Sequence, residues 1–331
     1  MKKGPVGLVA LFILMASSVF AEEPLLRFQG KIGVSAKEGW WGWMSFVAFS
    51  PDGRMVASDG PITSSDRTRG LTLWSFPEGR MVKHIPFHPA AIADTWQYYA
   101  SDRGVIDIAS GTVLRKGDAR WSPTGFSADG QYVALVGSGR PWIRVQRMAD
   151  GGVVSEFGRR AVFSVAFHPD ATLLASGHWD NITLWDVRTG ERLALLQGFG
   201  RYVTGIRFSP DGKLLAAGTD SGGLRIWDVA NRTPLHVLDL QGGDVSTPAF
   251  SPDGRLVAAG VYGTGTAFVI DVATAAIRDR AHVSDMGCGS VAFSPDGRYL
   301  ITPSTGGLIT WPHDRAGTIR VFQVGSDGTH G

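Results

Sequence analysis

A turn motif returns along this chain at intervals of about forty residues. Phe-Ser-Pro-Asp-Gly begins at Phe49, Phe208, Phe250 and Phe293. Proline fixes φ at the first corner of such a turn, aspartate accepts local backbone hydrogen bonds, and glycine tolerates the exit geometry. Each copy is therefore predicted to join two antiparallel strands. Two variants occupy the middle of the chain, at residues 126–130 and 167–170.

Short apolar runs flank each turn, such as 203–208 before one copy and 214–217 after it. A third run follows each turn, at 71–74, 105–108, 143–146, 182–185, 224–227, 268–270 and 319–322. These runs have the length and composition of strands. Units of four short strands cannot bury a face alone, so they must pack side by side, and a closed ring leaves few exposed edges.

Two units end their third run in a Trp-Asp pair, Trp185-Asp186 and Trp227-Asp228. With the turn and the Leu-Ala-Ser-Gly or Leu-Ala-Ala-Gly segment before them, these residues resemble WD repeats of the β-propeller superfamily. The resemblance extends over about residues 25 to 323 and is weakest in the second unit, around 86–99. It implies an all-β fold, a seven-bladed β-propeller.

Members of that family often join four side chains by hydrogen bonds: a turn aspartate, a histidine from a Gly-His pair, a strand serine or threonine, and the third-strand tryptophan. The resemblance implies part of such a network for Asp180, Ser176 and Trp185. The histidine is expected to be missing, because Gly198-Phe199 and Gly242-Gly243 occupy the matching loops. Some of the stiffening of the blades should therefore be absent.

The last blade lacks a fourth strand of its own. Its third strand ends at Val324, and residues 325–331 are too few and too polar to supply another. Residues 25–34 resemble a fourth strand and, as in the family, should complete the seventh blade. The predicted organisation is a signal peptide over 1–21, one propeller over 22–324 and a disordered tail over 325–331.

The first residues predict export. Lys2 and Lys3 precede an uncharged stretch with an apolar centre over 6–15. Small residues occupy the last and third-last positions of this stretch, so we expect cleavage after Ala21. An uncleaved anchor is the alternative, although a spanning helix needs roughly 20 apolar residues. The mature chain should then be periplasmic or secreted, without stable insertion in a membrane.

Charge and cysteine content exclude several classes of protein. The chain has 32 basic and 30 acidic residues, which argues against general binding of nucleic acid. Cys288 is the single cysteine, so an intramolecular disulfide and a cysteine zinc site are excluded. No phosphate-binding loop appears, and no cofactor is predicted. Six histidines have no metal-ligand spacing and are expected at turns or on the surface: His84, His88, His168, His178, His236 and His282.

The predicted binding site lies on the face where second strands connect to third strands and one blade connects to the next. The longest such connections, 60–70 and 303–318, are neighbours in the closed ring, and 38–43 runs between them. Aromatic and charged loop residues of this kind suit a protein or peptide partner. The alternative is that the tryptophans pack down as a lid. The candidates are Trp40, Trp41, Trp43, Arg67, Arg69, Trp311, His313 and Asp314.

A second candidate region lies on the same face over blades four and five. It contains Trp179, Phe199, Arg201, Tyr202 and Asp220, of which Trp179 and Tyr202 are the predicted contacts. The alternative is that large residues beside short turns cover the blade edges.

The leading hypothesis for function is a non-catalytic scaffold of the cell envelope that binds a protein or peptide near the junction of blades seven and one. The alternative is a hydrolase or lactonase-like enzyme at the mouth of the central channel, where the loops carrying Asp244 and Asp285 enter. The innermost strands are small and apolar and supply no acid pair, which favours the scaffold. The oligomeric state is not predicted.

Overall fold

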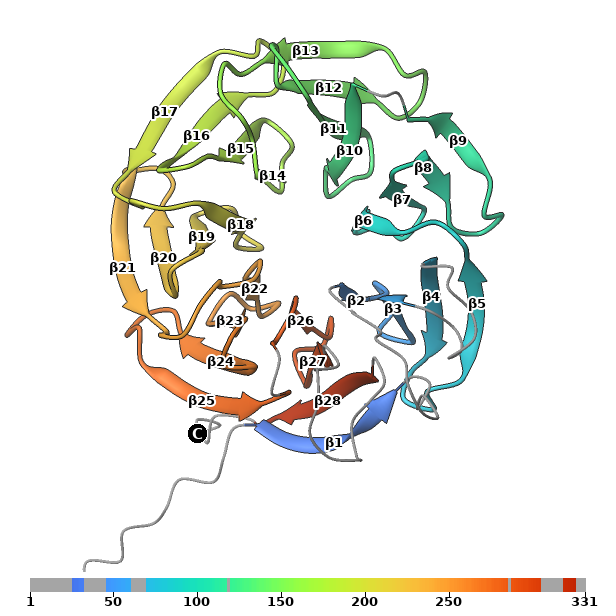
Figure 1. Cartoon of the computed structure of the whole chain (residues 1–331), viewed down its shortest axis with the longest axis vertical. Helices are drawn as coiled ribbons and strands as arrows, with labels where there is room; N and C mark the ends of the chain where they lie inside the picture. Colours follow the sequence, from blue (N-terminus) through green and yellow to red (C-terminus); the bar gives the residue numbers. More distant parts are fainter. Residues whose placement is uncertain are drawn as a thin grey trace, which may run out of the picture.

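The computed structural model describes residues 26–32, 46–60, 70–117, 120–284, 287–304 and 318–325. Within these ranges the chain forms seven four-stranded antiparallel sheets and no helix. The sheets stand as blades around a common axis (Figure 1). The all-β, seven-bladed β-propeller is therefore confirmed.

In each blade the first strand lies nearest the axis and the last lies at the rim (Figure 1). Blade 1 contains β2 (Val47–Phe49), β3 (Met55–Gly60), β4 (Gly70–Ser75) and β5 (Met81–Ile85). Blade 2 contains β6 (Pro89–Ile92), β7 (Tyr98–Ser101), β8 (Gly104–Asp107) and β9 (Val113–Lys116). Blade 3 contains β10 (Trp121–Phe126), β11 (Tyr132–Gly137), β12 (Ile143–Arg147) and β13 (Val153–Phe157).

The remaining blades follow the same order. Blade 4 contains β14 (Ser164–Phe167), β15 (Leu173–Gly177), β16 (Asn181–Asp186) and β17 (Arg192–Gln197). Blade 5 contains β18 (Val203–Phe208), β19 (Leu214–Thr219), β20 (Gly223–Asp228) and β21 (Thr233–Asp239). Blade 6 contains β22 (Ala249–Phe250), β23 (Leu256–Val261), β24 (Thr266–Asp271) and β25 (Ile277–His282). Blade 7 contains β26 (Ala292–Phe293), β27 (Tyr299–Ser304), β28 (Thr318–Val324) and β1 (Leu26–Ile32).

The two ends of the described chain close the ring. Strand β1 pairs antiparallel with β28, from Leu26 opposite Val324 to Ile32 opposite Ile319. The backbone N–H of Leu26 also donates to a carboxylate oxygen of Asp279, on the outer strand of blade 6, at 2.6 Å. The prediction that the N-terminal strand completes the last blade is confirmed. The boundaries predicted after residues 21 and 324 remain predictions.

The repeated turns have the geometry that their residues predict. In blade 1 the Ser50 hydroxyl donates to Asp52 at 2.6 Å and accepts from the backbone N–H of Met55 at 2.8 Å. Gly53 has φ of 68°, a conformation that disfavours other residues. The Ser50 hydrogen bond lowers the pKa of the Asp52 carboxyl. The motif thus fixes the first two strands of the blade by local chemistry.

The core lies in layers between neighbouring blades. One layer joins Ile182 and Leu184 of blade 4 to Val203, Leu215 and Trp227 of blade 5, all nearly excluded from solvent. Both faces of each sheet are thereby covered by its two neighbours. This requirement explains why the units form a ring, since any open end would expose an apolar sheet face.

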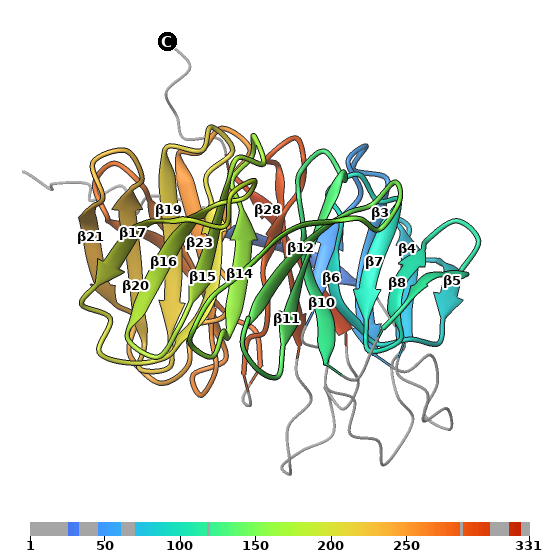
Figure 2. The same ribbon diagram turned by 90° about the horizontal axis from the view of Figure 1, so that it is seen from above.

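All strands run between two opposite faces of the ring, which Figure 2 shows from the side. One face carries the loops joining second to third strands and those joining each blade to the next; we call it the loop face. The other carries the Ser-Pro-Asp-Gly type turns and the turns joining third to fourth strands; we call it the turn face.

Candidate functional site

The first predicted site, at the junction of blades 7 and 1, falls on residues outside the described ranges. These residues are Trp40, Trp41, Trp43, Arg67, Arg69, Trp311, His313 and Asp314. Their role remains a prediction. The other two predicted contacts, Trp179 and Tyr202, lie on the described part of the loop face.

Three aromatic side chains meet on the loop face at blades 4 and 5. Trp179 lies in the β15–β16 loop, Tyr202 directly before β18, and Phe163 directly before β14. The ring centroids of Trp179 and Tyr202 are 3.8 Å apart, and those of Phe163 and Tyr202 are 4.8 Å apart at an interplanar angle of 83°. Trp179 and Phe163 leave 55% and 49% of their surface exposed. We call these three residues the aromatic cluster.

The cluster differs from the neighbouring aromatic residue in its exposure. Phe199 is buried, and its ring stacks on that of Trp227 with centroids 5.9 Å apart, while the Arg225 guanidinium lies 5.2 Å from the centroid of the Phe199 ring. Phe199 therefore packs blade 4 against blade 5. Trp179 does not cover a blade edge in this way, and exposed apolar rings that gather in one place favour a binding surface.

His178 fastens the three loops that present the cluster. Its ring Nδ1 donates to the carbonyl of Ala161 at 2.8 Å, two residues before Phe163. Its own carbonyl accepts from the N–H of Val203 at 3.0 Å, next to Tyr202, and Trp179 follows it directly. The cluster is thus held by backbone hydrogen bonds to one buried residue, so its geometry is preorganised.

The same histidine corrects an expectation from sequence. His178 is buried, and its Nε2 accepts from the hydroxyl of Ser176 at 2.9 Å, while that hydroxyl accepts from Trp185 Nε1 at 2.7 Å. The histidine expected to be missing is supplied by the β15–β16 loop rather than by the loop before the blade. His178 was expected at a turn or on the surface. It lies in the β15–β16 loop but is buried there, because Ser176 and Ala161 satisfy both ring nitrogens.

Burial of the ring lowers the pKa of His178 below its ordinary value of 6.5, with the Arg160 guanidinium contributing further. The unfolded chain therefore binds a proton more readily than the folded chain. We expect the contribution of His178 to the free energy of unfolding to have its full value above pH 6.5. As the pH decreases below 6.5, the free energy of unfolding should fall by at most about 1.4 kcal/mol per pH unit. Urea titrations between about pH 5.5 and 7.5 measure this slope.

The matched variants for that prediction are His178→Gln and His236→Gln, the latter on outer strand β21. The slope should vanish in the first and persist in the second. Carboxyl groups such as Asp52 and Asp211, whose pKa values are lowered from 3.8 by hydrogen bonds from Ser50 and Ser209, weaken the fold only at lower pH. An unchanged slope in His178→Gln would contradict the assignment.

Arginines border the aromatic cluster on one side. Arg160 lies 3.8 Å from the carboxylate of Asp180, the residue after Trp179. Arg140 Nε donates to the carbonyl of Arg159 at 3.1 Å, and Arg120 donates to the carbonyl of Arg140 at 2.6 Å. Carbonyl acceptors leave the guanidinium charges in place. The loop face over blades 3 and 4 is therefore strongly basic.

Other notable side chains of the loop face lie at or just after the ends of second strands. Asp59, at the end of β3, is 1% exposed, accepts from the backbone N–H of Phe46 at 2.8 Å and lies 3.4 Å from His88 Nε2. Burial raises the pKa of Tyr262, and the charges of Asp59 and Asp244 act in the same direction. Sequence reasoning missed Asp59. The matching position in the second strand of blade 4 is Gly177, which follows Ser176, so the repeat pattern indicates no functional side chain there.

Other candidates for chemistry at this face have structural surroundings. Cys288 is fully buried with its sulfur 3.0 Å from the Thr302 hydroxyl, and burial raises its pKa to about 12. Asp285 lies outside the described residues. Among the described residues no three His, Cys, Asp or Glu side chains gather as metal ligands. No helix in the same part of the chain is long and apolar enough to cross a membrane.

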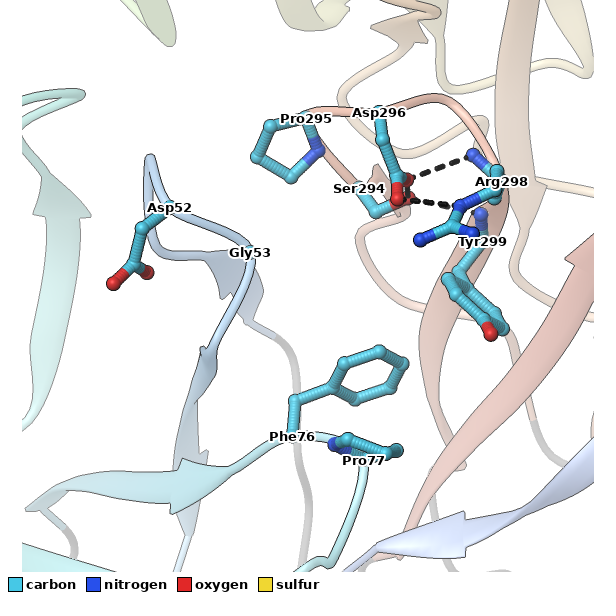
Figure 3. Close-up of a pocket in the computed structure, with 9 residues that line it drawn as sticks. All are labelled: Asp52, Gly53, Phe76, Pro77, Ser294, Pro295, Asp296, Arg298 and Tyr299. Carbon is cyan, nitrogen blue, oxygen red and sulfur yellow. Dashed lines mark hydrogen bonds and ion pairs between the residues drawn. The ribbon is translucent and has the colours of Figure 1, made fainter.

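A pocket of about 330 Å³ opens on the turn face between blades 7 and 1 (Figure 3). Phe76 and Tyr299 form its aromatic wall, with ring centroids 5.1 Å apart. The Asp296 carboxylate pairs with Arg298 at 2.7 Å, and Asp52 points away from the other labelled side chains (Figure 3). The pocket shares the blade junction of the first predicted site but lies on the opposite face.

Two segments match the family model described as "WD domain, G-beta repeat", residues 153–186 and 190–228. Each segment covers the outer strand of one blade and the three inner strands of the next. A sequence repeat therefore begins one strand before a blade does. The same offset makes β1, the first strand of the chain, the outer strand of blade 7. The matched residues include His178, Trp179 and Tyr202.

Two curated relatives carry the same name. The chain is 30% identical to coronin-7 of Mus musculus over 135 residues, which is 38% of this chain and 14% of that protein. It is 38% identical to coronin-7 of Bos taurus over 66 residues, 19% of this chain and 7% of that protein. The alignments thus span a small part of each relative, and they support the repeat architecture.

Proposed function

We propose that this WD-repeat β-propeller is a non-catalytic scaffold that binds a protein or peptide through its loop face. The fold suits such a role, because a ring of stiff sheets loses little entropy when a partner docks on its loops. The aromatic cluster is the observation that carries the proposal. Exposed Trp and Tyr side chains on ordered loops are typical anchors of protein interfaces.

The role of His178 supports a binding surface rather than a mobile loop tip. Its hydrogen bonds join the loops of Phe163, Trp179 and Tyr202, so the rings are already arranged before a partner arrives. The Ser176–His178–Trp185 network extends this order into the blade core. The residues predicted near the junction of blades 7 and 1, including Trp41 and Trp311, remain a separate proposed contact region.

Export to the cell envelope is part of the proposal and rests on the N-terminal sequence. Lys2 and Lys3, the apolar centre over 6–15 and the cleavage position after Ala21 motivate it. N-terminal sequencing of the protein purified from its native host provides the test. A chain that starts at Glu22 in the envelope fraction is expected, and an intact Met1 in the soluble cell fraction would contradict export.

The enzymatic alternative is less well supported. The Asp59 carboxylate is buried and already accepts from Phe46 while lying against His88. The thiol of Cys288 is buried and its raised pKa keeps it protonated at neutral pH. These groups hold blades together rather than face a substrate, so the scaffold is the function that the geometry favours.

Crosslinking capture from the native envelope tests the scaffold. The double variant Trp179→Ala/Tyr202→Ala is expected to lose at least about 90% of the captured partner, because hot-spot aromatics carry much of the binding energy. The matched control is Leu235→Ala/Val237→Ala, which removes exposed apolar side chains from outer strand β21. The control should capture the partner normally, and equal capture by both double variants would overturn the proposed surface.

A further inference from the structure

We propose that the loop face over blades 3 and 4 binds an acidic peptide segment of the partner protein. The inference rests on the proposed function and names the chemistry of the partner. We call this region the arginine–aromatic surface. It consists of Phe163, Trp179 and Tyr202 together with Arg120, Arg140, Arg159, Arg160 and Arg201.

The charge of this surface is one-sided. The described loop-face connections between Arg120 and Tyr202 contain five arginines and one acid, Asp180. Asp180 lies near only one of them, Arg160, at 3.8 Å, and both side chains are more than half exposed. A pair of this kind is weak and is easily exchanged for a stronger partner. Counting only Arg140, Arg159, Arg160 and Arg201 against Asp180, the surface keeps a net positive charge of about three.

Backbone carbonyls tie the arginine-bearing loops to one another. Arg120 donates to the carbonyl of Arg140, and Arg140 donates to the carbonyl of Arg159. These bonds join three consecutive loops, so basic side chains from neighbouring loops share one region of the face, and like charges in one region repel one another. A ligand with carboxylates relieves that repulsion, and guanidinium groups bind carboxylates in a bidentate manner.

Acids gather on the other half of the described loop face. Asp220, Asp239 and Asp244 lie in or beside the loop-face connections of blades 5 and 6. The backbone N–H of Asp220 donates to the Tyr202 carbonyl at 3.2 Å, so the change of sign occurs next to the aromatic cluster. An acidic segment would consequently lie over blades 3 and 4, with an apolar side chain on the aromatic cluster.

The surface also distinguishes an acidic peptide from other polyanions. The chain as a whole has a formal charge of only +2 and lacks the general excess of basic residues that binds nucleic acid. Exposed rings beside the arginines instead match a peptide, which offers carboxylates and an apolar side chain together.

The test uses a short fluorescein-labelled peptide of glutamates around one phenylalanine, with a lysine analogue for comparison. Anisotropy should show saturable binding of the glutamate peptide that weakens by at least about tenfold between about 20 and 200 mM NaCl. Arg159→Glu/Arg160→Glu/Arg201→Glu should weaken it by about a hundredfold or more. Trp179→Ala should weaken it by about thirtyfold.

A matched triple reversal on the turn face controls for total charge: Arg188→Glu/Arg192→Glu/Lys213→Glu. It should change affinity by less than about threefold, because the screening length is about 10 Å. Circular dichroism must show that all variants are folded. Equal losses in the two triple variants, or equal binding of the lysine peptide, would overturn the acidic-peptide inference.

Three further outcomes separate this inference from the proposed function. Equally tight binding of a single-stranded oligonucleotide would identify a general anion surface and overturn the inference. Self-association in sedimentation that the loop-face triple variant abolishes would identify a second copy as the occupant. Envelope capture that depends on Trp179 and Tyr202 but not on the arginines would keep the scaffold and reject its acidic partner.

Discussion

Replacing Ile32 by aspartate will open the ring and cost about 3–5 kcal/mol of the free energy of unfolding. Ile32 ends the closing strand β1, is 4% exposed and packs with Val47, Ile301 and Ile319 between blades 7 and 1. A carboxylate there is a buried charge without a partner. Because a domain is stable by only about 5–15 kcal/mol, much of the population should be unfolded or open-ringed.

Tryptophan fluorescence during urea unfolding measures this loss. Lys31→Asp is the matched control, since it introduces the same side chain at the neighbouring exposed position of β1. The control should change the unfolding free energy by less than about 1 kcal/mol. If Ile32→Asp unfolded at the same urea concentration as the parent chain, β1 would not close the ring.

Replacing Ser176 by alanine will cost about 2–4 kcal/mol, the second largest expected effect. The substitution leaves both Trp185 Nε1 and His178 Nε2 without their hydrogen-bond partner in a buried site. Since His178 also fastens the loops of the aromatic cluster, binding of the partner should weaken together with stability. Urea unfolding and envelope capture measure the two effects on one variant.

The repeats themselves supply the controls. Ser58 occupies the same position in blade 1, and among the described residues it accepts only from Trp74 Nε1, at 2.9 Å, so Ser58→Ala should cost about half as much. In blade 5 the position is Ala217, and Trp227 Nε1 is buried without a partner among the described residues. Ala217→Ser should therefore stabilise the protein by about 1 kcal/mol. Equal losses for Ser176→Ala and Ser58→Ala would contradict the role of His178.

The hydrogen-bonded networks around the third-strand tryptophans differ from blade to blade. The network of blade 4 lies beside the proposed surface. Blade 4 joins Ser176, His178 and Trp185 by hydrogen bonds, whereas blade 5 has Ala217 in place of the serine. The loop with the extra histidine is also the loop that presents Trp179. Stiffening at this place fits a surface that is used for recognition, because ordering before binding lowers its entropic cost.

The repeat pattern predicted the fold because the relevant chemistry is local. The Ser-Pro-Asp-Gly turns determine which strands form hairpins, as the Ser50 and Asp52 hydrogen bonds show. The seven third strands then give the number of blades. The missing fourth strand of blade 7 predicted that β1 returns to β28, because an unpaired apolar edge would otherwise remain.

The candidate site was predicted only in part. Trp179 and Tyr202 were named from their loops, whereas Phe163 was not named, because it directly precedes Ser164 and Val165 and cannot be told from the first residue of a strand. In the structure strand β14 begins at Ser164, and Phe163 is exposed beside Tyr202. Strand periodicity cannot tell a strand's first residue from the last residue of a loop.

The amino-acid sequence by itself determined the turns, the seven sheets and the exchange of the terminal strand, because each depends on hydrogen bonds and apolar patterns within a few residues. Only the tertiary structure decided that His178 completes the blade network, that Phe199 is buried while Trp179 is exposed, and that the arginines of three loops lie together. These outcomes depend on which loops of neighbouring blades meet in space. The spacing of residues along the chain does not give that information.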